Sequence, residues 1–181
     1  SNFTVLRSAY QLAGTTRTDL LATSTLAGGT DGNYTITVAG GAAAAANARY
    51  MFRVANSTVS TGRINAVVVG DIGTAYVNLV SDQSCANCHG PNISAHYGYQ
   101  AGASQCTVCH DSTELPAEAQ FVQIVHGIHN SEQMPTGEYA FAPDEVFAVS
   151  YPTYMTNCSV CHDDETKLAA ANAMTVSGEN C

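Results

Sequence analysis

The sequence predicts an α+β fold, in which a small antiparallel β-sandwich or barrel precedes a loop-rich, partly helical region. Most of the alternating Thr, Val and Ala residues lie before Ser81, and turn residues separate them. All seven Cys and all six His follow Ser81, in the region that also holds the clearest helical pattern. This asymmetry predicts two domains, a β-rich one at residues 1–80 and a second one at residues 81–181.

The first region contains runs of β-branched and aromatic residues bounded by Gly, Asn and Asp, a pattern typical of strands. The predicted strands are residues 32–40, 48–56, 62–70 and 74–80. Residues 28–33, GGTDGN, predict a hairpin turn. Short antiparallel strands of this kind form a sandwich or a barrel.

The second region alternates less regularly and contains many short loops. Residues 116–130 predict a helix, because Pro116 suits the first helical position and the apolar residues from Phe121 to Ile128 recur at 3–4 spacing. A second, short helix is expected within residues 156–174. Few aliphatic residues remain to form an interior, so something other than side chains must fill it.

One pentapeptide pattern, C-x-x-C-H, occurs three times, at residues 85–89, 106–110 and 158–162. It is the attachment signature of c-type haem: the two thiols form thioether bonds to the porphyrin vinyl groups, and the adjacent His ligates the iron. The pattern therefore predicts three covalently bound haem c groups. The predicted anchors are Cys85, Cys88, Cys106, Cys109, Cys158 and Cys161, and the predicted proximal iron ligands are His89, His110 and His162.

Structural zinc and thioredoxin-like chemistry are the alternatives for these cysteine pairs. Three pairs divide awkwardly into four-ligand zinc sites, and zinc does not need a His directly after every second Cys. A thioredoxin-like pair follows a strand and opens a helix of an α/β unit, and no such pattern surrounds these pairs. Covalent haem accounts for all three copies.

The three histidines outside the motifs match the number of predicted haems. His96, His126 and His129 would complete bis-histidine coordination at three irons. His126 and His129 lie three residues apart on one predicted helix face, so they would serve two neighbouring haems. His96 follows His89 too closely to reach the far side of the same haem, and we assign it to the haem of the second motif.

A short acidic run, Asp163 to Glu165, follows the third motif where a helix is expected to start. Carboxylates at a helix N-terminus interact favourably with the helix dipole. The alternative use of the run is a calcium site.

Composition and charge limit the partners of the chain. The net charge is −9 with six Lys and Arg in total, which argues against nucleic acid, because phosphate binding needs clustered cations. No apolar run is long enough for a membrane span, the longest candidate being interrupted by Gly70, Asp71 and Gly73. The chain begins without Met, so it has either lost a signal peptide or belongs to a longer protein.

The motif region resembles a known family. The segments SCANCHGPNISAHYGYQAGASQCTVCHD, FVQIVHGIHN and VSYPTYMTNCSVCHDD are similar to the multihaem domains of the outer-membrane decahaem c-type cytochromes of metal-reducing bacteria. The preceding segment, from DGNYTITV to VNLV, resembles the β-domain that comes before each haem domain in that family. The resemblance implies a cell-surface or extracellular location and electron transfer to extracellular acceptors or to other multihaem cytochromes.

The chain also departs from that family. The family's haem domains carry five haems, whereas this chain ends in a lone Cys181 near where a fourth motif would begin. Either the chain is a fragment cut inside that motif, or it is a three-haem protein whose last cysteine is free or pairs between molecules. Copies that associate head to tail would form a filament, because a heterologous interface that does not close propagates.

We therefore expect an exported trihaem cytochrome that transfers electrons and is not an enzyme. Electrons would hop between closely spaced bis-histidine haems toward an extracellular acceptor or a neighbouring cytochrome. One alternative is a multihaem reductase with an open haem iron, which the histidine count does not favour. Another is a structural cell-surface module whose haems are redox-inert.

Overall fold

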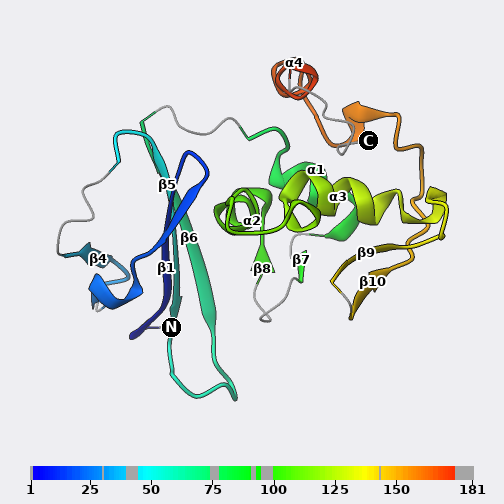
Figure 1. Ribbon diagram of the computed structural model, residues 1–181. Coiled ribbons are helices and arrows are strands. Elements are labelled where there is room, and N and C mark those ends of the chain that lie inside the picture. The colour runs from blue at the N-terminus through cyan, green and yellow to red at the C-terminus, as the bar shows by residue number, and fades with distance from the viewer. Residues whose placement is uncertain are drawn as a thin grey trace.

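The structure is a computed structural model that describes residues 2–29, 31–39, 45–73, 78–90, 93–94, 100–142 and 144–173. Its strands are β1 (Val5–Ala13), β2 (Thr16–Asp19), β3 (Ser24–Gly28), β4 (Tyr34–Val38), β5 (Ala48–Ala55), β6 (Asn65–Ile72), β7 (Ile93–Ser94), β8 (Gln100–Ala101), β9 (Tyr139–Ala142) and β10 (Glu145–Phe147). Its α-helices are α1 (Asp82–His89), α2 (Ala103–His110), α3 (Phe121–His129) and α4 (Glu165–Ala173). The first six strands lie at one end of the molecule and the helices lie beside them (Figure 1).

The main sheet is antiparallel, with the strand order β2-β1-β5-β6. β1 and β5 pair from Val5 opposite Ala55 to Leu12 opposite Arg49. The register shifts between Leu6 and Ser8, so Arg7 is an extra residue at a β-bulge. β3 and β4 form a separate hairpin.

The two faces of the main sheet pack against different partners. Leu12 and Met51 lie on one face, where they form a buried cluster with Val108 of α2. Tyr50 and Phe52 lie on the opposite face, because side chains alternate along a strand. Together with Leu20 and Val38 of the β3–β4 side, these aromatic residues line a groove. α2 is therefore anchored to the sheet by apolar contact.

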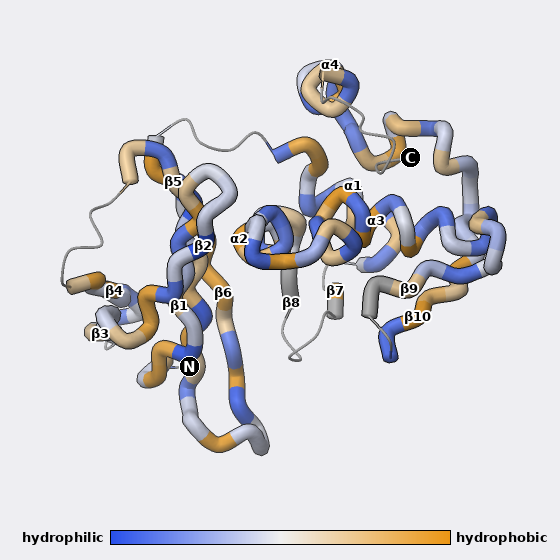
Figure 2. Tube along the Cα trace, viewed as in Figure 1, coloured by the Kyte–Doolittle hydropathy of each residue, from blue (hydrophilic) through white to orange (hydrophobic). Residues whose placement is uncertain are grey.

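The chain after Ser81 has a different interior. Its buried apolar residues in the described part of the chain are Ala103, Val108 and Ala119, and its buried polar residues are Ser84, Ser112 and Ser131. Apart from Val108, which packs on the sheet, these side chains are small. Apolar and polar residues alternate over short distances along this part of the chain (Figure 2).

The α+β class predicted from the sequence is confirmed, with antiparallel sheets in the N-terminal part and four α-helices. The predicted strands at residues 32–40, 48–56 and 62–70 correspond to β4, β5 and β6, and the 28–33 turn joins β3 to β4. The sequence analysis missed β1, β2 and β3. Of the fourth predicted strand, residues 74–77 lie outside the described residues, and residues 78–80 are not a strand.

Both predicted helices exist in shorter form. α3 begins at Phe121, and a 3-10 turn at Ala117–Ala119 precedes it. α4 covers Glu165–Ala173, after a 3-10 turn at Cys158–Val160. No helix of the described residues is both long enough and apolar enough to cross a membrane.

Candidate functional site

The first C-x-x-C-H motif forms the last five residues of α1. Ser81 caps the helix, since its Oγ accepts a hydrogen bond of 3.0 Å from the backbone N of Ser84. Gly90 follows the helix with a φ of 74°, a conformation that favours glycine. Cys85 is half-buried, whereas Cys88 and His89 are exposed.

The second motif forms the last five residues of α2. The first residue of α2 is hydrogen-bonded to α1. The backbone N of Ala103 donates to Asp82 Oδ1 of α1 at 2.7 Å. A Cβ at Gly102 would overlap the Asp82 carboxylate, so the glycine leaves room for this close approach. Val108 is fully buried against the sheet and Cys109 contacts the same cluster. The first two motifs are thus held next to each other.

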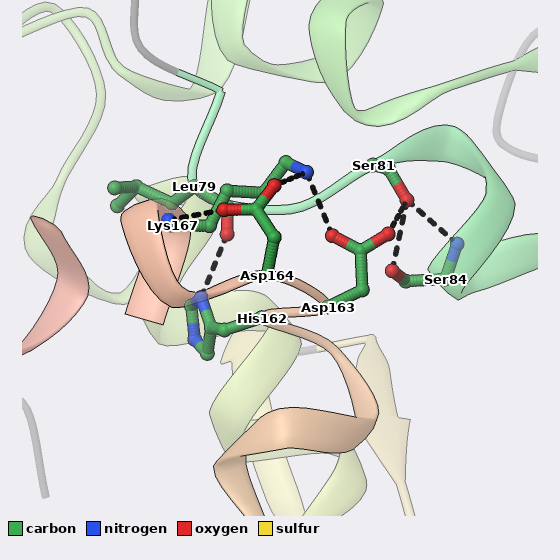
Figure 3. A network of polar contacts seen from close by, with 7 residues as sticks. All are labelled: Leu79, Ser81, Ser84, His162, Asp163, Asp164 and Lys167. Carbon is green, nitrogen blue, oxygen red and sulfur yellow. Dashed lines mark hydrogen bonds and ion pairs between the residues drawn. The ribbon is translucent and has the colours of Figure 1, made fainter. Parts of the chain in front are cut away.

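The third motif starts on the 3-10 turn Cys158–Val160 and ends at His162. Figure 3 shows how it is joined to the start of α1: Ser81 Oγ donates to Asp163 Oδ2 at 2.5 Å. Lys167 Nζ pairs with Asp163 Oδ1 at 2.8 Å and also contacts the Asp164 carboxylate. The hydrogen bonds from Lys167 and Ser81 lower the pKa of the Asp163 carboxyl.

The thiols of the three motifs lie near one another. Burial raises the pKa of the Cys106 thiol to about 11, and Cys85 contributes to that rise. Burial also raises the pKa of Cys85, with Cys161 as the next cause. Desolvation raises the pKa of Cys161, and the charge of Cys88 adds to it. Because α1 also bonds to Ala103 at the start of α2 and, through Ser81, to Asp163 after the third motif, three motifs that are far apart in the sequence converge on one region.

Helix α3 carries His126 and His129 three residues apart, as predicted. Gly127 between them is buried, and a Cβ there would overlap the ring of Tyr139 from β9. The Tyr139 hydroxyl in turn donates to the carbonyl oxygen of Glu118 at 2.7 Å. Gly127 thus allows Tyr139 of β9 to pack directly against α3, between the positions of the two histidines.

Main-chain carbonyl groups fix the ring orientation of three histidines. The Nδ1 atoms of His110, His129 and His162 lie 2.7 Å from the carbonyl oxygens of Ala119, Val125 and Leu79, respectively. A carbonyl oxygen only accepts, so each Nδ1 donates to it, and in a neutral imidazole Nε2 then keeps its lone pair. This is how proteins orient histidines that ligate metals, and these residues therefore fit axial ligands of a haem iron.

The ring centroids of His89 and His129 lie 5.9 Å apart, and the ring planes are inclined at 82°, an edge-on arrangement. An imidazole–metal bond is about 2 Å long, so two imidazoles on opposite sides of one iron have ring centroids about 6 Å apart. The spacing therefore suits one shared iron.

His126 is exposed at the residue level, yet enough protein surrounds its ring that desolvation lowers its pKa. The charge of His162 is the next cause, followed by that of His129. Burial therefore favours the neutral imidazole of His126, which is the form that ligates metals.

Two residues singled out from the sequence lie outside the described residues: His96, between β7 and β8, and Cys181. The structure also contains supporting groups that the sequence analysis did not identify. Asp82 and the carbonyl group of Leu79 are separated from their partners by 21 and 83 residues, and no local pattern marks such contacts.

Three converging C-x-x-C-H motifs with carbonyl-oriented imidazoles define the class of the protein as a multihaem c-type cytochrome. A family model described as outer membrane cytochrome MtrC/MtrF-like, domains II/IV, matches residues 77–180, and the chain belongs to this family. No curated protein and no solved structure gives a match to the chain.

Membership of this family confirms several of the expectations from the sequence. The protein binds haem c, serves extracellular electron transfer together with other multihaem cytochromes, and belongs at the cell surface or outside the cell.

Proposed function

We propose that the chain is a trihaem electron carrier, with one haem at each of the three motifs. The anchors are Cys85 and Cys88, Cys106 and Cys109, and Cys158 and Cys161. The proximal ligands are His89, His110 and His162. The observation that carries the proposal is the convergence of the three motifs together with the carbonyl-bound Nδ1 atoms, which leave Nε2 available for iron.

The distal ligands follow from the spacing of the imidazoles. His129 shares the first iron with His89, as the 5.9 Å ring separation suggests. His96 is assigned to the haem of the second motif, with His110, because it follows His89 too closely to reach the far side of the first haem. His126 then remains for the third iron, with His162.

When bound, haem supplies one-electron redox chemistry, with electrons passing between neighbouring irons toward an extracellular acceptor. The residues of the chain hold and orient the ligands. The carbonyl groups of Ala119, Val125 and Leu79 keep the Nδ1 protons in place and increase the basicity of the ligating nitrogens. With six histidines for three irons, no iron keeps an open position, and the chain is not an enzyme.

The test combines haem quantification with a low-temperature electron paramagnetic resonance spectrum of the oxidised protein. We expect three haems per chain, all low-spin. The variant His129→Gly should convert one haem to high-spin and leave three haems attached, and His126→Gly should convert a different one. A high-spin haem in the unaltered protein would instead identify an open iron and favour a reductase.

We further propose that residues 1–80 and 81–181 are distinct units, a β-domain and a haem domain. The contrast in their interiors supports this division, although α2 packs on the sheet. Limited proteolysis tests it: we expect the first stable cut between Ile72 and Asp82. Initial cuts at other sites would argue for a single unit.

The acidic run after His162 serves the fold in this proposal and does not bind calcium. Asp163 and Asp164 both pair with Lys167, and Asp164 Oδ1 accepts from the Lys167 backbone N at 2.7 Å. Melting temperatures measured with calcium and with a chelator should be equal, whereas a rise with calcium would restore the calcium interpretation.

Polymerisation is the second candidate, favoured by one surface. β6 is the end strand of the main sheet, and Val68 and Ile72 are 54% and 44% exposed on the face away from α2. The groove that includes Phe52 continues this apolar surface, which suits contact with another copy. Light scattering over a concentration series should show assembly in the unaltered chain and its loss in Val68→Lys; a monomer at every concentration would exclude it.

A further inference from the structure

The sheet face that α2 covers carries two arginines just beyond the helix. Arg53 follows Met51 by two residues on β5, so it lies on the same face, about 7 Å further along the strand. Its cross-strand neighbours are Ser8 of β1 and Val67 of β6. Arg7 is the extra residue of the β1 bulge, so Arg7 and Ser8 both lie opposite Arg53.

Arg7 differs from Arg17 and Arg49 in its hydrogen bonds. Arg17 pairs with Glu114 at 2.8 Å, and Arg49 pairs with Asp71 at 2.7 Å. The Nε of Arg7, by contrast, is buried and makes no hydrogen bond within the described residues. Leaving a buried donor without a partner destabilises a fold, so such a donor in a native structure requires an explanation.

The second motif reaches the same face of the sheet. Cys109 and Val67 both pack against the buried cluster that contains Met51, and Val67 is the direct neighbour of Arg53. β8 lies beside β6 (Figure 1). A c-type haem is attached at its vinyl edge and carries two propionate carboxylates at the opposite edge. Arginine is the side chain best suited to bind carboxylates, because its guanidinium group donates two parallel hydrogen bonds.

We propose that Arg7 and Arg53 bind the propionates of the haem attached at Cys106 and Cys109. This inference rests on the proposed function, because it requires a haem at the second motif. The two cations keep the propionates ionised and favour the reduced iron, which carries one positive charge less than the oxidised iron. The β-domain thereby tunes the potential of one haem.

The experiment uses the haem-loaded chain and four variants: Arg53→Gln, Arg7→Gln, Arg53→Lys and Arg63→Gln. Arg63→Gln is the matched control. Arg63 is also an arginine with a buried, unbonded Nε, but it precedes Val67 by four residues, about 13 Å along the chain. Midpoint potentials are measured by spectroelectrochemistry over a pH series, with haem content and melting temperature measured on the same samples.

We expect Arg53→Gln and Arg7→Gln each to lower the potential of one haem and to move its pH dependence to higher pH. Arg53→Lys should restore much of the potential, and Arg63→Gln should have a much smaller effect. Three haems per chain with equal shifts in Arg53→Gln and Arg63→Gln, or with none, would overturn the inference and leave the proposed function intact. A haem missing from the second motif of the unaltered chain would instead overturn the proposed function.

Discussion

The sheet and the motif region of this molecule are stabilised in different ways. In the main sheet, side chains such as Leu12, Met51 and Val54 are at most 6% exposed and form an ordinary apolar core. Beyond Ser81, buried positions are occupied mainly by Ala and Ser, and the structure there is held by caps and by contacts to main-chain groups. From this difference we expect the motif region to depend on attached porphyrins for its interior, whereas the sheet does not.

The largest test of this contrast is to remove every haem. With all six motif cysteines replaced by Ser, we expect the amides of α1, α3 and α4 to exchange with solvent roughly a hundredfold faster than in the haem-loaded chain. The amides of β1 and β5 should keep their protection, and they serve as the internal control. Hydrogen exchange read by mass spectrometry measures both. Undiminished protection of α3 would mean that side chains alone sustain the motif region.

Deleting equal side-chain volume from each region gives the next largest effect. Leu12→Ala should lower the free energy of unfolding by about 3 kcal/mol, because Leu12 is fully buried beneath Val108 and Met51. Leu168→Ala in α4 removes the same atoms from a half-buried site and should cost about 1 kcal/mol or less. Denaturant titration followed by circular dichroism measures both, and equal losses would contradict the contrast.

The haem-binding residues of the motif region are predictable from the sequence, whereas the residues that hold them in position are not. The three motifs and the α3 histidines follow from local patterns, because two cysteines and a histidine must lie at fixed spacing to attach and ligate one haem. The partners that position them are not local: Asp82 caps a helix 21 residues away, and Leu79 contacts His162 across 83 residues. Such contacts depend on the folded arrangement and leave no periodic signal.

In the sheet, some strands are predictable from the sequence and others are not. β4, β5 and β6 were predictable because they are runs of β-branched and aromatic residues between clear turn residues. β1 includes Arg7 at a bulge and Gln11 within a buried stretch, and these polar residues interrupt the apolar run. Gln11 is tolerated because its Nε2 donates to the Tyr50 hydroxyl at 2.8 Å. The strand was therefore missed where tertiary hydrogen bonds compensate for burial of a polar group.

A third test addresses the ion pair of Arg49, a residue that also bonds to the motif region. Arg49 is 1% exposed and bonds to Asp71, to Asn78 and to Thr107 of α2. Asp71→Asn should lower the free energy of unfolding at pH 7 by roughly 2 kcal/mol, less than for a fully buried pair because Asp71 is one-third exposed.

The pH dependence of this effect has a definite sign. The hydrogen bond from Arg49 lowers the pKa of Asp71 below its usual 3.8. The stabilisation is therefore complete above pH 3.8 and is lost as the pH falls through the lower pKa of the folded state. Unfolding measured over a pH series should show the unaltered chain and Asp71→Asn converging below pH 3.8. A constant difference down to the lowest pH would show that shape, and not charge, sets the effect.

The smallest expected effect concerns the contact between the first and third motifs. Ser81 caps α1 and also donates to Asp163 beside the third motif. Ser81→Ala should lower the free energy of unfolding by about 1 kcal/mol, the usual value for an N-cap. The control Ser159→Ala removes an exposed hydroxyl bonded to Asn157, two residues away, and should have a smaller effect.

A pair of further substitutions separates the two roles of Ser81. Ser81→Asn keeps a capping oxygen and a donor for Asp163, so it should restore most of the stability. Ser81→Asp also caps the helix, but it places a second carboxylate beside Asp163, and like charges repel. If Ser81→Asp is as stable as Ser81→Asn in thermal unfolding at low salt, the bond to Asp163 does not couple the first and third motifs. If Ser81→Asp is less stable and salt removes the difference, that coupling is electrostatic and helps to keep the two haem-binding segments together.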